Sequence, residues 1–170
     1  MSAVSVVQPS TRRFRNRQHA GEALAERLHA RASDRPVVLA PALGAVPVAA
    51  VAAAALDAPL DVVGADGQPS GDRSPVSLVA RTAIIVADGI ATGTTARAAI
   101  AHARGRGAAR VVLAAPVGRA ESVRSLAGEV DELVCLLEPR VLWSVAFWYE
   151  NFDAVTQSEV DALLARQAVS

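Results

Sequence analysis

Lysine is absent from this chain of 170 residues, and its 17 arginines balance its 17 aspartates and glutamates, so the formal net charge at pH 7 is zero. A chain without net charge lacks the overall basic field that nonspecific nucleic-acid binding requires, although a local basic patch is compatible with this balance. We therefore expect a small-molecule ligand and no nucleic-acid partner.

Cysteine and long apolar runs are also scarce. The single cysteine, Cys135, lies within the apolar run ELVCLL, which excludes a disulfide framework and a CxxC or Cys/His zinc site. No apolar run reaches the roughly 18 to 20 residues of a membrane span. The charges near the N-terminus follow the apolar stretch, which is the reverse of a secretory signal. These absences predict a cytoplasmic protein without a membrane partner.

Aromatic residues make up only 4% of the chain, whereas 52% of it is hydrophobic and much of that share is alanine. Because alanine buries little area, the core should hold closely approaching helices. The length suits one well-cored domain. Residues 1–12 show no sustained period and include Pro9, so we expect a disordered lead-in before a single domain over residues 13–170.

Apolar strands alternate with amphipathic helices along that domain. The patterns predict strands over 36–41, 58–64, 76–80, 82–87, 109–117 and 131–139, and helices over 17–31, 48–56, 95–106, 119–127 and 156–166. Continuous runs of Val, Ile and Leu are typical of strands buried on both faces. The chain is therefore predicted to be an α/β protein with a parallel sheet and helices on both faces.

Ligands of such sheets bind beyond the carboxyl ends of the strands, where three loops of this chain begin. These loops read ALGAVP, ADGQPSG and DGIATGTT, and the Gly/Pro/Ser/Asp-rich segment 65–75 is the most exposed by composition. The third carries the strongest signal. Its glycines and the following helix can point amide N–H groups inward, and its threonines add hydroxyl donors. This pattern predicts a phosphate-binding loop, and the alternative is a plain strand-to-helix turn capped by Thr94.

Four segments of the chain resemble type I phosphoribosyltransferases of a bacterial branch. Members of that branch look like FRDR…AG…LA, LALPRGGVPVA, DDGIATGAT and WYEDF. This chain reads FRNRQHAGEALA, VLAPALGAVPVA, ADGIATGTT and WYENF, in the same order and from about Phe14 to the end. The resemblance implies the type I phosphoribosyltransferase fold, which is Rossmann-like.

The resemblance also implies a ligand and its site. In the family the Thr-Gly loop, here residues 88–95, holds the 5-phosphate of phosphoribosyl pyrophosphate (PRPP), a Mg²⁺ ion accompanies the pyrophosphate, and homodimers are common. Asp88 would be the catalytic acid that binds the ribose hydroxyls while an acceptor replaces pyrophosphate. The implied ligand-binding residues are Leu43, Gly44, Gly89, Ala91, Thr92, Gly93, Thr94 and Thr95.

Three departures from the family pattern reduce the charge around that ligand. Ala87 replaces the first of two adjacent acids, and Ala42 stands where the family has an arginine. The segment after Val63 is short and carries little positive charge, which predicts a reduced hood. Whether glycosyl transfer survives is left open. A repurposed apolar pocket for isomerisation or cyclisation and a noncatalytic sensor of a phosphorylated metabolite are the alternatives.

Two further clusters have both functional and structural interpretations. Residues 140–152 concentrate most of the aromatic side chains, so Trp143 and Trp148 are candidate ligand contacts, unless this segment only seals the sheet edge. Four arginines surround Phe14 in residues 12–17. We interpret this segment as a solvated edge anchored by Phe14, and a patch that docks phosphate is the alternative. We expect Cys135 to be a buried hydrophobe and none of the three histidines to be catalytic.

Overall fold

The computed structural model describes residues 3–6, 13–31, 35–64 and 74–169. Six strands form one parallel sheet in the order β1-β6-β5-β4-β2-β3. The strands are β1 (Ala3–Val6), β2 (Val37–Ala40), β3 (Leu60–Val62), β4 (Thr82–Val86), β5 (Arg110–Val117) and β6 (Glu132–Leu137). The predicted parallel sheet is confirmed.

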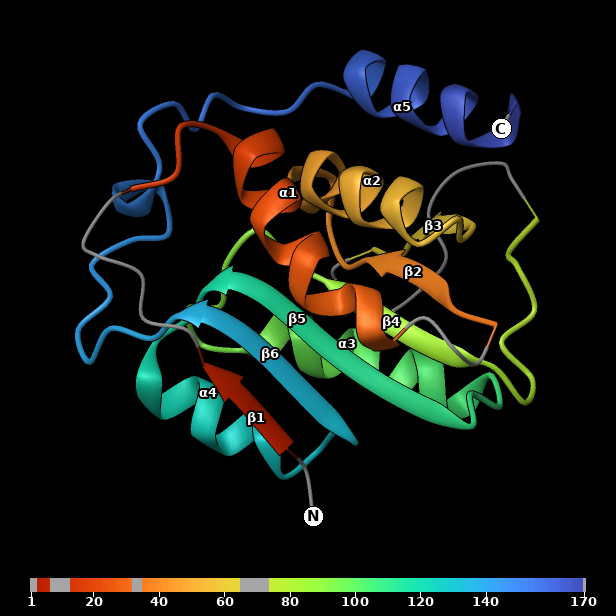
Figure 1. Ribbon diagram of the computed structural model, residues 1–170, viewed down its shortest axis with the longest axis horizontal. Coiled ribbons are helices and arrows are strands. Elements are labelled where there is room, and N and C mark those ends of the chain that lie inside the picture. Colours follow the sequence, from red (N-terminus) through yellow and green to blue (C-terminus); the bar gives the residue numbers. More distant parts are fainter. Residues whose placement is uncertain (1–2, 7–12, 32–34, 65–73, 170) are drawn as a thin grey trace.

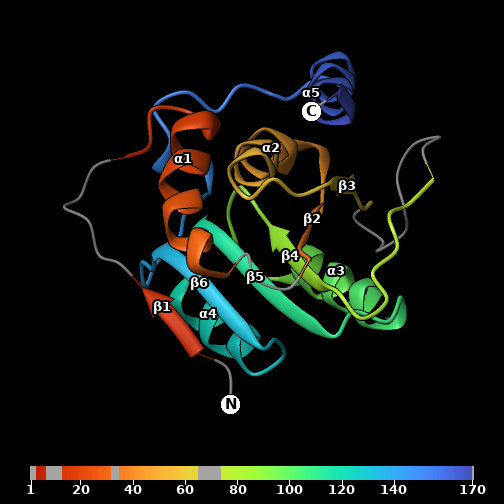
Figure 2. The ribbon, with the colours of Figure 1, turned by 45° about the vertical axis from the view of Figure 1, so that its right-hand side comes forward.

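Helices cover both faces of the sheet, as predicted (Figure 1). They are α1 (Arg17–Leu28), α2 (Val46–Ala55), α3 (Thr94–Gly105), α4 (Ala120–Ala127) and α5 (Gln157–Val169), with short 3₁₀ turns η1 (His29–Arg31), η2 (Leu43–Ala45) and η3 (Ala146–Trp148). In both views α1 and α2 lie on one face and α3 and α4 on the other (Figure 2). None of the helices in the described part of the chain is long and apolar enough to cross a membrane.

The core divides into two layers because successive side chains of a strand point to opposite faces. In β4, Ile84 and Val86 pack with α1 and α2, whereas Ala83 and Ile85 pack with α3 and α4. Alanine dominates the buried face of α2, which lets α1 and α2 pack closely; a Cβ atom added at Gly21 would lie 2.9 Å from the carbonyl oxygen of Val48. The alanine-rich composition thus serves helix packing.

Two expectations about local structure were wrong. Ala3–Val6, placed in the disordered lead-in, form β1 and pair with β6, while residues 1, 2 and 7–12 lie outside the described part. Residues 76–80 form no strand: only Val79 makes an isolated bridge, to Ala108. Most of the predicted loop, residues 65–73, also lies outside the description.

Two segments that are far apart in the sequence meet beside the carboxyl ends of the strands. Phe14 pairs with Tyr149 in a parallel bridge, and the backbone N–H of Phe14 donates to the carbonyl of Trp148 at 2.9 Å. From there the C-terminal segment runs to α5, which packs on the outer side of α2 (Figures 1 and 2). We call residues 13–16 together with 145–153 the clasp. The clasp brings these two segments next to the loop that follows β4.

Candidate functional site

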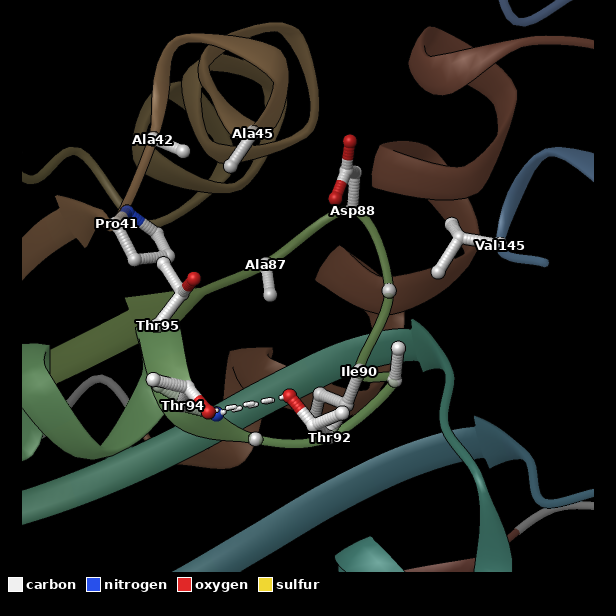
Figure 3. A pocket seen from close by; sticks show the side chains of 14 residues that line it. Pro41, Ala42, Ala45, Ala87, Asp88, Ile90, Thr92, Thr94, Thr95 and Val145 are labelled. Carbon is white, nitrogen blue, oxygen red and sulfur yellow. Dashed lines mark hydrogen bonds between the residues drawn. The ribbon is translucent and has the colours of Figure 1, made fainter. Parts of the chain in front are cut away.

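The site lies where the chain leaves neighbouring strands in opposite directions. After β2 the chain turns to α2 on one face, and after β4 it turns to α3 on the other. Such a divergence opens a crevice at the carboxyl ends of the two strands, which is where open α/β sheets bind ligands. A pocket of about 190 Å³ occupies this crevice (Figure 3).

The loop after β4, residues 87–93, is held firmly to the sheet. The N–H of Ala87 donates to the carbonyl of Ala114, and the N–H of Ile90 donates to the carbonyl of Val117, both at 2.9 Å. The Ser122 hydroxyl donates to the carbonyl of Ala91 at 2.5 Å. These three hydrogen bonds tie the loop to β5 and to α4.

Gly93 forms the sharp turn into α3. Its φ of +88° is in the left-handed region, and a Cβ atom there would lie 3.1 Å from Cδ1 of Leu126. The first N–H groups of α3 have no acceptor within the helix, and the helix dipole adds partial positive charge there. The Thr92 and Thr94 hydroxyls lie 3.2 Å apart at this end. The combination of N–H groups and hydroxyls suits a phosphate.

The rest of the pocket is largely apolar. Apart from Asp88 and the threonines, its lining consists of small and aliphatic groups, and Figure 3 shows Ala87 between the threonines and Asp88, with Ala42 and Ala45 opposite. The lining residues are Pro41, Ala42, Ala45, Ala87, Asp88, Gly89, Ile90, Ala91, Thr92, Gly93, Thr94, Thr95, Ala96 and Val145. Among these described residues no cationic side chain lines the pocket.

Asp88 is the one charged residue of the lining, and it is partnered. Its carboxylate Oδ2 lies 3.5 Å from Nε of Arg17, with side chains that are 23% and 11% exposed. Burial raises the pKa of the Asp88 carboxyl above its ordinary value, and the charge of Arg17 opposes this rise. The Tyr149 hydroxyl donates to the backbone carbonyl of Asp88 at 2.5 Å. Burial, with the nearby Asp88 charge, raises the pKa of Tyr149, so it remains a neutral donor.

The structure brings most of the sequence-predicted site residues together and separates four of them from the pocket. Asp88, Gly89 and Ala91–Thr95 all line it, but Leu43 packs against the core, and Gly44 faces the ion pair of Asp88 and Arg17 instead of the pocket. Trp143 is 86% exposed and Trp148 is half-buried against the core. Neither tryptophan lines the pocket; Val145 does, against Gly89.

Arg17 was missed by the sequence reasoning, which treated the arginines before α1 as a solvated edge. Phe14 does anchor this edge, being buried, and Arg13 stacks over Phe147 at 4.6 Å. Of the three described arginines in this segment, Arg13 and Arg15 are exposed and Arg17 turns inward to the site. One sequence signal could have pointed to Arg17: it lies in FRNR, which belongs to the first of the four segments that carry the family resemblance. If this arginine is buried, it requires a partner.

Other reactive side chains lie away from the pocket. Cys135 is fully buried, and burial raises the pKa of its thiol to about 12, so it behaves as the expected hydrophobe. Nowhere in the described ranges do three or more His, Cys, Asp or Glu side chains gather as a metal would require. A Mg²⁺ ion held by several protein carboxylates therefore does not fit this part of the chain.

The fold and the pocket define a class of protein: a parallel α/β protein with a loop suited to phosphate at its topological switch point. The switch point is the place where β2 and β4 lead to helices on opposite faces of the sheet. The sequence matches the phosphoribosyl transferase domain family over residues 14–148. The chain therefore belongs to this family, as the resemblance implied, and its fold is the Rossmann-like fold of type I phosphoribosyltransferases.

Similar proteins agree with this assignment. Two Mycobacterium tuberculosis proteins that carry the provisional name of phosphoribosyl transferase, from strains H37Rv and CDC 1551 / Oshkosh, are 35% identical over 208 aligned positions covering 90% of this chain. The chain spans only 46% of their length.

Among solved structures, TT1426 from Thermus thermophilus has a TM-score of 0.80 and 29% identity, covering 91% of this chain and 99% of that one. Orotate phosphoribosyltransferase from Aeropyrum pernix has a TM-score of 0.56 and 28% identity, covering 70% of this chain and 68% of that one.

Proposed function

We propose that this chain binds a phosphoribosyl compound of the PRPP type in the pocket at the switch point. The 5-phosphate lies at the start of α3, against the N–H groups of residues 93–95 and the hydroxyls of Thr92, Thr94 and Thr95. The ribose lies across Ala87, and its hydroxyls meet Asp88. The observation that carries this proposal is the pocket itself, which joins a helix N-terminus and three threonines to one carboxylate.

Glycosyl transfer is the finer part of the proposal. The acceptor's lone pair would form a bond to the anomeric carbon, the bond from that carbon to pyrophosphate would break, and pyrophosphate would leave with the electron pair. The acceptor's proton would go to solvent. Asp88 would stabilise the positive charge that develops on the ribose.

The leaving group would depart beside alanines, which slows this reaction. Ala42 and Ala45 line that side of the pocket and offer no charge to pyrophosphate. The described residues offer no cluster of carboxylates that would hold Mg²⁺. The ion would therefore enter bound to the pyrophosphate oxygens, where it would neutralise developing negative charge. We therefore expect firm binding of the phosphoribosyl part and slow turnover.

The two alternatives are less well supported. An isomerase or cyclase for an apolar substrate has no use for the threonines and the helix N-terminus at one end of the pocket. A sensor would use the same phosphate contacts without turnover, so a turnover assay separates it from a transferase. The homodimer implied by the resemblance stays a prediction.

The test is a calorimetric titration with PRPP, ribose 5-phosphate and inorganic phosphate, each with and without Mg²⁺. Thr92→Val keeps the side-chain shape but removes the hydroxyl, and Thr92→Ser, which keeps the hydroxyl, is the matched control. One lost hydrogen bond to a charged group should weaken binding by about tenfold in the valine variant. The serine variant should bind like the wild type.

A thermal-shift experiment gives an independent reading. Ligand at 100 times its dissociation constant should stabilise the fold by about 2.7 kcal/mol, or on the order of 5 to 10 °C in Tm for this chain length. If neither ribose 5-phosphate nor PRPP binds under any of these conditions, the proposed function is wrong.

A further inference from the structure

Arg17 joins three segments that are far apart in the sequence. It is the first residue of α1, and its Nε faces the Asp88 carboxylate at 3.5 Å. Its Nη1 donates to the backbone carbonyl of Asp153 at 2.6 Å, and its guanidinium carbon lies 3.7 Å from the centre of the Phe152 ring. The N-terminal helix, the loop after β4 and the C-terminal segment therefore meet at one guanidinium.

The position of the guanidinium is set mainly by groups other than Asp88. The Phe152 ring covers one of its faces, and the Asp153 carbonyl fixes one of its edges. Both partners belong to the clasp, which is itself held by backbone hydrogen bonds between Glu150 and Phe14 and between Asn151 and Arg15. Because Arg17 is anchored in this way, it can hold Asp88 in place.

The contact between Arg17 and Asp88 is longer than a formed charge-assisted hydrogen bond. Such bonds measure about 2.7–2.9 Å between nitrogen and oxygen, whereas this separation is 3.5 Å and Nε is buried without a hydrogen-bond acceptor. Catalytic hydrogen bonds are often long without substrate and shorten in the complex. The Nε donor of Arg17 can therefore still form a shorter hydrogen bond to the Asp88 carboxylate.

We propose that Arg17 is a positioning residue, which keeps the Asp88 carboxylate ionised and directed at the ribose end of the pocket and so couples the clasp to ligand binding. This inference rests on the proposed function for the identity of the ligand. Its structural half, the control of Asp88 by Arg17, does not depend on any ligand.

The electrostatic surroundings of Asp88 give Arg17 this control. Burial favours the neutral acid, and the nearby guanidinium favours the carboxylate. The groups that face Asp88 from the packed elements are Arg17 from α1 and the Tyr149 hydroxyl from the clasp. Residues 41–45 and 89–95, also described, carry no ionisable side chain. Among the described residues, Arg17 is the cation that opposes the protonation of Asp88, so its removal should favour the neutral acid.

The first experiment measures the pKa of the Asp88 carboxyl directly, by carbon NMR of the side chain in the full chain without ligand. Arg17→Met should raise this pKa by about one unit or more relative to wild type, and Arg17→Lys should raise it less because the charge is kept. Arg13→Met is the matched control, since Arg13 also stacks on an aromatic ring but on Phe147. An unchanged pKa in Arg17→Met would overturn the inference.

If Arg17→Met does not fold, Arg17→Lys and Phe152→Leu carry the test. Phe152→Leu removes the ring that positions the guanidinium but leaves every charge in place. It should raise the pKa of Asp88 in the same direction by a smaller amount. If both variants keep the wild-type pKa, Arg17 does not control Asp88.

The second experiment follows ribose 5-phosphate affinity from about pH 4, near the ordinary pKa of an aspartate, to about pH 8, because burial raises the pKa of the Asp88 carboxyl above that ordinary value. Protonation of Asp88 weakens binding as the pH falls, and in Arg17→Met this loss should begin at a higher pH than in wild type. The ligand's own phosphate ionises near pH 6 in all variants, so only the difference between variants reports Asp88. Parallel pH profiles would contradict the coupling to binding.

The two experiments distinguish a failure of the proposed function from a failure of this inference. A wild type that binds no phosphoribosyl ligand overturns the proposed function, while the NMR titration still decides whether Arg17 controls Asp88. A wild type that binds, with an unchanged Asp88 pKa in every Arg17 variant, overturns only the inference.

Discussion

The two ends of the pocket differ in what they preserve of the phosphoribosyltransferase pattern. At the α3 end, the glycine turn and the threonines of DGIATGTT are intact and line the pocket. Ala42 lies at the α2 end and Ala87 between the ends, and by the resemblance these alanines stand where the family has an arginine and an acid. One end is polar, whereas the other is apolar.

If the proposed function holds, this difference makes phosphate binding and pyrophosphate handling separable in this chain. The phosphate end depends on the backbone of a loop that is hydrogen-bonded to β5, so it persists as long as the loop does. On the same proposal, pyrophosphate binding at the other end would depend on side-chain charge, and the alanines that line that end supply none. The chain would then bind the 5-phosphate firmly and the leaving group weakly.

The largest expected effect comes from breaking the phosphate end at its turn. Gly93→Ala forces a side chain into a φ of +88°, 3.1 Å from Cδ1 of Leu126. We expect a loss of about 1–2 kcal/mol in the free energy of unfolding and loss of measurable ribose 5-phosphate binding. Urea unfolding and calorimetry measure the two effects.

Gly105→Ala is the matched control, because a Cβ atom there meets nothing within 4 Å. A glycine replaced by alanine near the end of α3 should leave stability unchanged or raise it by up to about 1 kcal/mol. If Gly93→Ala and Gly105→Ala behave alike, the turn at Gly93 is not the basis of phosphate binding.

A smaller effect is expected from restoring charge at the other end. Ala42 is half-exposed, so Ala42→Arg can place a guanidinium at the pocket, and PRPP affinity should rise by about tenfold. Ribose 5-phosphate, which lacks pyrophosphate, should bind with nearly unchanged affinity. Ala42→Met controls for side-chain length. An equal gain for both ligands would show that the α2 end does not face the pyrophosphate.

Much of the fold was predictable from local patterns. The strand β5 is a continuous buried apolar run after its exposed first residue, Arg110. The cap of α5 was visible as TQSE, and the Thr156 hydroxyl accepts from the N–H of Glu159. Residues 3–6 were not predicted as a strand because they become an edge strand only by pairing with β6, and the local sequence pattern does not reveal that pairing. Residues 76–80 have strand propensity but lie outside the sheet, apart from the Val79 bridge.

The part of the candidate site that lies within one loop was predictable from the sequence, whereas contacts between distant segments were not. The residues of DGIATGTT are contiguous, so their shared pocket followed from one loop. The contact of Arg17 with Asp88 joins α1 to the loop after β4 and requires the clasp to be folded. The aromatic residues of 140–152 were interpreted by composition, and composition does not tell which of them turns inward: Tyr149 does so, and Trp143 does not.

The smallest effect is expected at Trp143, two residues before the C-terminal part of the clasp. Trp143 is 86% exposed, so Trp143→Ala should change the free energy of unfolding by no more than about 0.5 kcal/mol. Ribose 5-phosphate affinity, measured by calorimetry, should stay at the wild-type value. A marked loss of affinity would mean that Trp143 turns onto the ligand in the complex, as the sequence pattern first suggested.

The central claim is that the α3 end of the pocket holds the 5-phosphate, and amide NMR tests it most directly. Ribose 5-phosphate is added to the labelled protein, and the backbone N–H signals are followed residue by residue. We predict that the largest changes fall on residues 91–96, with little change around Arg104 and Arg110, an arginine pair at the opposite end of α3 and β5. Changes confined to those arginines, or no change at residues 91–96 under saturating ligand, would contradict the account.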